Sequence, residues 1–446
     1  MAGGRRYAGN SALRPQTGRV TSLGYDTSGG GTGPASRVGP LATRPGVVLV
    51  VVVAAWAAVP SLVAGPKITW AVLAALLVLV LASLWQHGRT VRWTMPVTLV
   101  TVVLLCGTVS SVHHGTPVEL VAGAATALLL VGCTLLAVTC GPDDVRLLAR
   151  GLVLLALAEL AVALAGSSFG VPAPWGYLGG AAPAYDVNQL VPALGDRATG
   201  TMAHPIPFGT LMAVAAALCL TRATRWPVSV RVLAGAAAGY GLAMSGSRSA
   251  AVVLCAATVI AVVTPGALRI GMAARIAIVL TAAGVVLRLQ DARLGIVSSL
   301  EGTGSLTHRL AALDAAERLL DRSLAQTLLG SGTGSLDDLF AAGLLQLDGF
   351  FAVDNQLVAT FAVAGLVGAV ALVAALALGL LRGDPQVRPA ALLMVGMVMS
   401  FDLLEWNATA VLLVALATLG SAARTARPGP EAALPRPATA VPVGTS

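Results

Sequence analysis

The chain has 446 residues, of which 56% are hydrophobic and only 11% are charged, and its mean hydropathy is +0.84. Soluble domains carry about 25% charged residues, so this composition excludes a soluble enzyme, a secreted disulfide scaffold and a disordered protein. The apolar residues come in blocks of roughly 17 to 25, the length that crosses a bilayer as a helix. The sequence therefore predicts an all-α polytopic membrane protein.

The net charge of +8 has a topological explanation. Arginines cluster in short segments between apolar blocks, where basic residues mark the cytoplasmic side of a membrane, so no nucleic-acid partner is expected. The five cysteines lie in or at the ends of apolar blocks and form no CxxC pair. Neither a disulfide framework nor a metal site is therefore expected.

Both ends of the chain are predicted to be disordered tails. Residues 1–45 are rich in Gly, Ser, Thr and Arg, and residues 423–446 are rich in Pro and Ala. Such compositions cannot bury a core. The first apolar block begins only near Val47, so no secretory signal peptide is expected. The transmembrane domain is predicted at residues 46–422.

Twelve apolar spans are predicted within this domain, which places both termini on one side of the membrane. Lys and Arg number 20 on the face of the termini and 8 on the opposite face. The positive-inside rule therefore predicts a multi-pass protein of the plasma (inner) membrane with both termini in the cytoplasm. The spans are expected at 47–64, 68–85, 95–112, 118–139, 146–165, 205–221, 229–245, 249–264, 270–287, 356–381, 389–404 and 408–421.

Two predicted outward loops are long, near 166–204 and 289–353, whereas most connections in a compact protein are short. They indicate the working face. Within the second loop, residues 305–329 predict an amphipathic helix, placed at the outer membrane interface or over the mouth of the bundle. Its leucines recur at helical spacing: Leu306, Leu310, Leu313, Leu320, Leu324 and Leu328.

Two outward arginines are candidates for binding an anion. Arg248 lies in the turn 245–249 (SGSRS), where small hydroxyl residues and a glycine precede a helix, a setting that suits phosphate. Arg197 precedes the sixth span. The alternative interpretations are an interfacial arginine that reaches lipid head groups, for Arg248, and an ordinary loop charge, for Arg197.

His204 and Asp354 are the candidate proton acceptors. His204 is followed by a proline that begins a span, so it could equally cap that helix. Asp354 and Asn355 precede the tenth span, as a simple N-cap or, for Asp354, as a base that takes a proton from a hydroxyl. The other ionisable residues in or at the ends of spans are Glu159, Asp402 and Glu405.

Four motifs follow one another between residues 172 and 368: 197–205 (RATGTMAHP), 247–249 (SRS), 330–334 (GSGTG), and 354–355 (DN) ahead of Gly365. In their order and in the large outward loop before the tenth span, they resemble the O-antigen ligase and Wzy-type polymerase family. Ligases of that family typically present His-Asn where this chain has Asp-Asn. The resemblance implies an architecture similar to GT-C glycosyltransferases. It also implies glycan transfer from an undecaprenyl-diphosphate carrier, without a metal or nucleotide cofactor.

The predicted function is a membrane glycosyltransferase that polymerises or ligates lipid-linked oligosaccharide in cell-surface polysaccharide biosynthesis. The expected partners are the lipid-linked donor, a sugar acceptor, the bilayer and polysaccharide-assembly proteins. The alternative is a transporter or flippase of the same lipids, which would need polar groups along a mid-membrane path and internal repeats. The candidate residues are Arg197, Arg248, Arg309 and Asn355 for the diphosphate, and Asp354, His204 and Arg248 for catalysis.

Overall fold

The computed structural model describes residues 44–88, 91–113, 117–177, 188, 190–263, 280, 304–347 and 351–419. They all belong to one compact unit, residues 40–446, and every regular element in these described ranges is a helix. The predicted all-α class is confirmed. The two predicted tails beyond residues 44 and 419, the ninth predicted span apart from Leu280, and residues 289–303 and 348–350 of the second loop lie outside the described residues.

The helices of the described residues start within four residues of the predicted spans, but the predicted ends of two spans are wrong: the first ends at Ala58 and not at 64, and the eleventh at Met397 and not at 404. Proline stands in the first turn of seven of the described helices (α1, α2, α3, α4, α5, α6 and α15), where its fixed φ favours a helix start. The helices are α1 (Pro45–Ala58), α2 (Pro66–His87), α3 (Met95–Ser110), α4 (Pro117–Thr139), α5 (Pro142–Phe169), α6 (Pro205–Leu220), α7 (Val228–Ser245), α8 (Arg248–Val263), α11 (Gly304–Arg318), α12 (Leu324–Leu329), α13 (Leu336–Ala341), α14 (Gln356–Arg382), α15 (Arg388–Met397) and α16 (Asn407–Thr418).

Five helices in the described part of the chain are long and apolar enough to cross a membrane: α2, α4, α5, α7 and α14. Another six are apolar but have fewer than 18 residues: α1, α3, α6, α8, α15 and α16. An α-helix rises 1.5 Å per residue, so a bilayer core of ~30 Å needs about 20 residues. The chain is therefore a helical membrane protein in which shorter apolar helices pack between longer ones.

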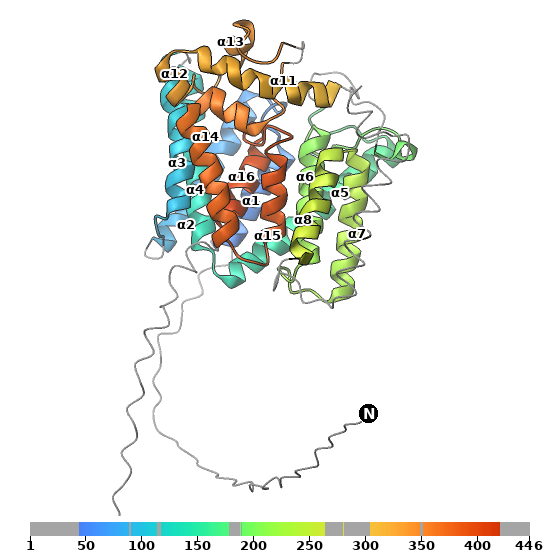
Figure 1. Ribbon diagram of the computed structural model, residues 1–446. Helices are drawn as coiled ribbons and strands as arrows, with labels where there is room; N and C mark the ends of the chain where they lie inside the picture. The colour runs from blue at the N-terminus through green and yellow to red at the C-terminus, as the bar shows by residue number, and fades with distance from the viewer. Residues whose placement is uncertain are drawn as a thin grey trace, which may run out of the picture. The chain divides into compact units, whose positions relative to one another are not determined.

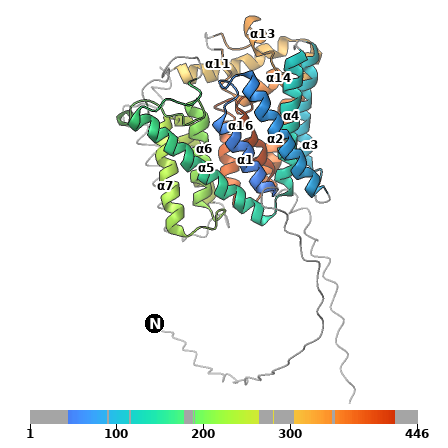
Figure 2. The same cartoon turned by 180° about the vertical axis from the view of Figure 1, so that it is seen from behind.

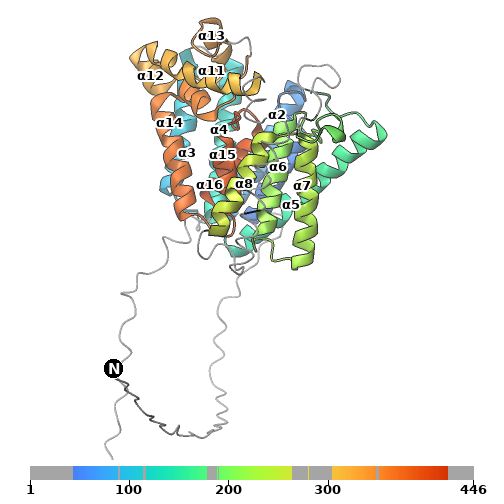
Figure 3. The ribbon, with the colours of Figure 1, turned by 45° about the vertical axis from the view of Figure 1, so that its right-hand side comes forward.

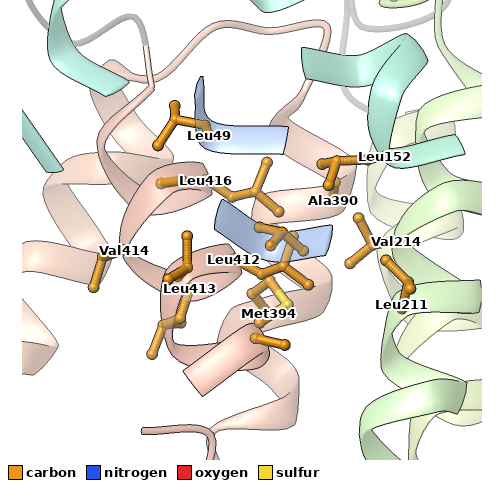
Figure 4. Packing of buried hydrophobic residues seen from close by; sticks show 14 of the residues in the cluster. Leu49, Leu152, Leu211, Val214, Ala390, Met394, Leu412, Leu413, Val414 and Leu416 are labelled. Atoms are coloured by element: carbon orange, nitrogen blue, oxygen red, sulfur yellow. The ribbon is translucent and has the colours of Figure 1, made fainter. Parts of the chain in front are cut away.

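The helices form two groups joined by a central layer. Helices α2, α3, α4 and α14 lie together, and α5 to α8 lie together, with α1, α15 and α16 between the two groups (Figures 1 and 2). The core lies where these parts meet. Leu49, Leu211, Val214, Met394 and Leu412 are almost completely buried there (Figure 4).

Helices α11, α12 and α13 lie across one end of the bundle, where α11 and α12 contact α14 (Figures 1 and 3). Of the two placements expected for the amphipathic helix, the structure has the one over the bundle. The predicted single helix 305–329 is wrong in its length. Helix α11 ends at Arg318, a 3-10 turn (Leu319–Asp321) follows, and Arg322 is extended before α12 begins.

The predicted apolar stripe of this segment does not face the bundle. Leu310, Leu320 and Leu324 are exposed by 52%, 57% and 74%, whereas Ala312 and Leu319 are completely buried. Alanine allows a helix to lie close against its neighbour, so the smaller side chains of α11 make the contact and the leucines point away from it.

Candidate functional site

The segment before α6 is fixed to the end of α7. The backbone N–H of Ala198 donates to the carbonyl of Met244 at 2.9 Å. Arg197 Nε donates to the carbonyl of Ser245, also at 2.9 Å. Together these two bonds hold Arg197 beside the turn that connects α7 to α8, as the prediction of a shared arginine site requires.

The turn itself is shaped around this arginine. Gly246 ends α7 in the left-handed region at φ 61°, and a Cβ there would lie 3.2 Å from Arg197 Nε, so the position suits only glycine. Ser247 follows with 2% exposure, and its hydroxyl has no hydrogen-bond partner among the described residues. Arg248, half-buried, is the first residue of α8. Two arginines and an unsatisfied hydroxyl thus meet at a helix N-terminus, where the helix dipole attracts anions.

His204 occupies the N-cap of α6. Its Nδ1 accepts a hydrogen bond from the backbone N–H of Ile206 at 3.2 Å. The preceding Ala203 has a φ of 59°, a strained conformation for a residue with a side chain, and it directs His204 into the cap. The capping role that was open from the sequence is therefore the role that the geometry describes.

The environment of His204 keeps its imidazole neutral. The ring stacks on Phe401 at 5.9 Å between centroids and lies 5.2 Å from the ring of Trp406. Burial, and secondly the charge of Arg197, lowers the pKa of His204 from 6.5 to about 3. At neutral pH the ring carries one proton, and its Nδ1 is already used as an acceptor.

Asn355, and not Asp354, caps α14. The Asn355 Oδ1 accepts from the backbone N–H groups of Leu357 at 2.9 Å and Val358 at 3.3 Å. Asp354 stands one residue before the cap, partly exposed, and its charge interacts with that of Asp402. The cap therefore does not depend on the Asp354 carboxylate.

The loop 398–406, between α15 and α16, connects these parts. The backbone N–H of Gln356 donates to the carbonyl of Val398 at 2.8 Å, and the backbone N–H of Leu404 donates to Gln356 Oε1 at 2.6 Å. Phe401 and Trp406 of the same loop hold the ring of His204. The start of α14 and the start of α6, about 150 residues apart in the sequence, are thereby tied to one loop.

Helix α14 is discontinuous at Gly365. This residue has φ 69° and ψ −172°, which only glycine adopts readily, and a Cβ there would lie 2.3 Å from the carbonyl oxygen of Leu328. The loop 330–334 fills the break. The backbone N–H groups of Ser331 and Gly332 donate to the carbonyls of Ala362 and Val363, each at 2.9 Å.

Arg322 completes this junction, although no motif in the sequence identifies it. Its guanidinium donates to the carbonyls of Ala362 at 2.8 Å and Phe361 at 3.0 Å, and to the hydroxyl of Ser331 at 2.9 Å. Burial lowers its pKa to about 10. The carbonyls exposed by the break in α14 are thus satisfied by a cation and by loop amides, so Arg322 has a structural role.

A cavity of about 270 Å³ lies beside the first half of α14. Its walls come from α3, α4, α14 and the loops 330–334 and 398–406. The walls of α3 and α4 are mainly apolar, and Asp402 and Glu405 line the cavity from the 398–406 loop. The sequence placed these two carboxylates at the end of a span but could not show that they share a cavity with α14.

The remaining predicted residues do not join this group in the same way. Arg309 lies on α11, but its side chain is outside the described part of the chain. Glu159 of α5 accepts from the backbone N–H of Thr201 at 2.7 Å and from its hydroxyl at 2.6 Å. Glu159 therefore ties α5 to the segment between Arg197 and His204. No protein family model matches this sequence, and no curated protein matches it.

Proposed function

We propose that the protein is a membrane glycosyltransferase that uses a glycan linked to an isoprenoid diphosphate, such as undecaprenyl diphosphate, as its donor. The observation that carries this proposal is the turn at the start of α8. Arg197 is bonded to the carbonyl of Ser245, Ser247 offers an unsatisfied buried hydroxyl, and Arg248 opens the helix. Guanidinium groups and a helix N-terminus are the protein groups that best neutralise a diphosphate.

The transfer follows from this placement. A hydroxyl oxygen of the acceptor sugar forms a bond to the anomeric carbon of the donor. The bond from that carbon to the diphosphate oxygen breaks, and its electron pair leaves with the lipid diphosphate. Arg197 and Arg248 stabilise the charge that develops on the leaving group. The proton of the hydroxyl passes to Asp354, the residue before Asn355, which caps α14.

The proposal includes the orientation of the chain. Twelve spans with both termini in the cytoplasm place α11 to α13 and the arginine turn on the outer face of the plasma membrane. Consistent with this, the segments that carry Arg89 and Arg92, Arg146 and Arg150, and Arg382 and Arg388 would all be cytoplasmic. A reporter fused after Arg388 should read cytoplasmic, and one inserted within 289–353 should read extracytoplasmic. The opposite pattern would contradict the site assignment.

A transporter of lipid-linked glycans is the second candidate, because α14 is broken at Gly365 within its length. Discontinuous helices form the binding sites of many transporters. Here, however, the freed carbonyls are bonded to Arg322 and to the loop 330–334 and are not open to a substrate. Movement of labelled lipid-linked glycan across a vesicle without an acceptor would favour transport over transfer.

The test of the proposed function is transfer by purified protein in nanodiscs, with lipid-linked oligosaccharide as donor. Arg248→Ala should lower the rate on the order of 10²- to 10³-fold, the loss typical of removing one group that stabilises developing negative charge. Arg248→Lys should restore little, because an ammonium lacks the planar fork of donors. The matched control is Arg222→Ala, an exposed arginine between α6 and α7. Near-normal transfer by Arg248→Ala would contradict the proposal.

A further inference from the structure

The cavity beside α14 has a character different from that of the arginine turn. Of the charged residues that line it, both are acidic, and no lysine, arginine or histidine is among its lining residues. Besides the apolar side chains of α3 and α4, its walls carry amide and hydroxyl groups from Thr108, Thr126, Thr333, Gln356, Thr360 and Asn407. Hydroxyls, amides and carboxylates are the groups that hydrogen-bond to a polyhydroxylated ligand.

The two carboxylates of the cavity differ in what they do for the fold. Asp402 accepts hydrogen bonds from the backbone N–H groups of Leu404 and Glu405, so it closes the turn of its own loop. The Glu405 carboxylate makes no hydrogen bond or ion pair with any described residue, and the residue is exposed. It lines the cavity. An exposed carboxylate that serves no bond of the described fold can accept hydrogen bonds from a ligand in the cavity.

Negative charge accumulates around Glu405. Desolvation by the surrounding protein, followed by the charge of Asp337, raises the pKa of Glu405. Asp402 interacts electrostatically with Glu405 and with Asp354. Asp337 from α13 and Asp402 from its own loop are thus the charges that act on this carboxylate, and Asp354 acts on Asp402. A ligand with a negative charge would meet the two carboxylates that line the cavity, without a cation in the cavity wall.

The volume limits the size of the ligand. Pockets for small molecules usually measure ~300–1,000 Å³, so a cavity of about 270 Å³ accommodates one ring and not a chain of sugars. Its lining residue Gln356 begins α14 two residues after Asp354, and its lining residue Asp402 interacts electrostatically with Asp354. A hydroxyl of a ring held there would lie close to the proposed proton acceptor.

We infer that this cavity binds the attacking sugar ring of the acceptor and selects a ring without negative charge, with Glu405 accepting hydrogen bonds from its hydroxyl or amine groups. This inference rests on the proposed function, because it names the substrate class of the acceptor. A neutral or amine-bearing sugar fits the cavity, and a uronic acid is excluded by like charge.

The experiment measures binding without donor lipid, by saturation-transfer NMR titration of the full-length protein in nanodiscs. The probes are methyl glucoside, glucosamine and glucuronate. The wild type should bind the first two and reject glucuronate. Glu405→Gln keeps the size of the side chain and removes its charge. It should weaken binding of glucosamine roughly 10- to 100-fold, the effect of losing one charge-assisted hydrogen bond. It should also strengthen binding of glucuronate roughly tenfold or more.

Two further variants isolate the effect. Asp321→Asn removes an exposed carboxylate of the same outward segment that does not line the cavity, and it should leave all three affinities unchanged. Ala127→Leu narrows the cavity from α4 without changing its charge and should weaken binding of glucoside and glucosamine alike. Equal binding of glucuronate and glucoside by the wild type, or unchanged affinities in Glu405→Gln, would overturn the inference.

Failure of the inference and failure of the proposed function give different results. A wild type that transfers glycan while Glu405→Gln keeps all three affinities contradicts the cavity assignment and leaves the transferase proposal standing. A wild type that binds sugars with the stated preference but transfers nothing contradicts the transferase proposal and leaves the sugar site standing.

Discussion

The arginine turn and the cavity beside α14 are opposite in charge and in construction. At the turn, Arg197 is bonded to the end of α7 and Arg248 is the first residue of α8. In the cavity, Asp402 and Glu405 face apolar walls of α3 and α4. The difference suits two substrates of different charge, a lipid diphosphate that needs cations and an acceptor sugar that needs hydrogen-bond acceptors.

One loop contacts residues of both regions. Loop 398–406 carries the carboxylates of the cavity, and its Phe401 and Trp406 hold the imidazole of His204, which caps α6. The charge of Arg197 also acts on the imidazole of His204. His204 therefore contacts the loop that carries the carboxylates and feels the charge of the arginine turn.

The largest effect on the transfer rate is expected for Asp354, the proposed proton acceptor. Asp354→Asn should lower the transfer rate about 10²- to 10⁴-fold, as loss of a general base does. The cap of α14 should be unaffected, because Asn355 supplies both capping bonds. The measurement is single-turnover transfer by protein in nanodiscs, with donor binding checked in parallel.

Asn355→Ala is the companion variant for Asp354→Asn. It should cost about 0.5–2 kcal/mol of stability through the lost cap, without the rate loss expected of Asp354→Asn. If Asp354→Asn transfers glycan within a few-fold of the wild type, Asp354 is not the proton acceptor. Another residue would then have to accept the proton of the attacking hydroxyl.

The sequence was informative where local patterns decide the structure. The apolar block predicted at 356–381 is α14 (Gln356–Arg382), and the one predicted at 205–221 is α6 (Pro205–Leu220). Proline at a helix start and a continuous apolar run are local signals, so contacts with other helices do not change the helix that they predict. The sequence also placed Arg197 and Arg248 at the ends of predicted spans on the same side of the membrane, and a shared site for the two stays a prediction.

The sequence could not reveal contacts between distant segments. Periodicity in 305–329 suggested one helix with a leucine face, but Arg322 leaves the helix to bond the carbonyls of Phe361 and Ala362, about 40 residues away. The same holds for Glu405, which becomes a cavity residue only through the packing of its loop on α14. Hydropathy identifies a helix and does not identify its neighbour.

The next effect tests whether the cavity depends on the break in α14. Gly365→Ala should destabilise the protein by about 1–3 kcal/mol from backbone strain alone, and by more because the new Cβ would meet backbone atoms of Leu328 and Gly330 at 2.3 to 2.5 Å. Thermal unfolding in detergent measures this change. Gly365→Ala should also abolish the sugar binding expected of the cavity, because Val363 and Ala364 form part of the cavity wall.

The control for Gly365→Ala is Gly239→Ala on α7. A Cβ at Gly239 meets nothing within 4 Å, and alanine favours a helix interior over glycine by about 1 kcal/mol. That variant should be neutral or slightly more stable. Equal behaviour of the two glycine variants would show that the break at Gly365 does not hold the cavity in place.

The smallest expected effect concerns the imidazole of His204 and the pH dependence of stability. The folded protein holds the pKa of His204 at about 3 against 6.5 for a free histidine, chiefly through burial. Below pH 6.5 the unfolded chain therefore binds a proton that the folded chain does not, so stability falls as the pH falls from 6.5 toward 3 and is unaffected above 6.5. This term reaches about 2 kcal/mol at pH 5. His204→Gln cannot gain a proton, so its unfolding temperature should drop less than that of the wild type between pH 7 and pH 5. Parallel pH profiles for the two proteins would mean that His204 is solvated in the folded protein and is not buried against Phe401 and Trp406.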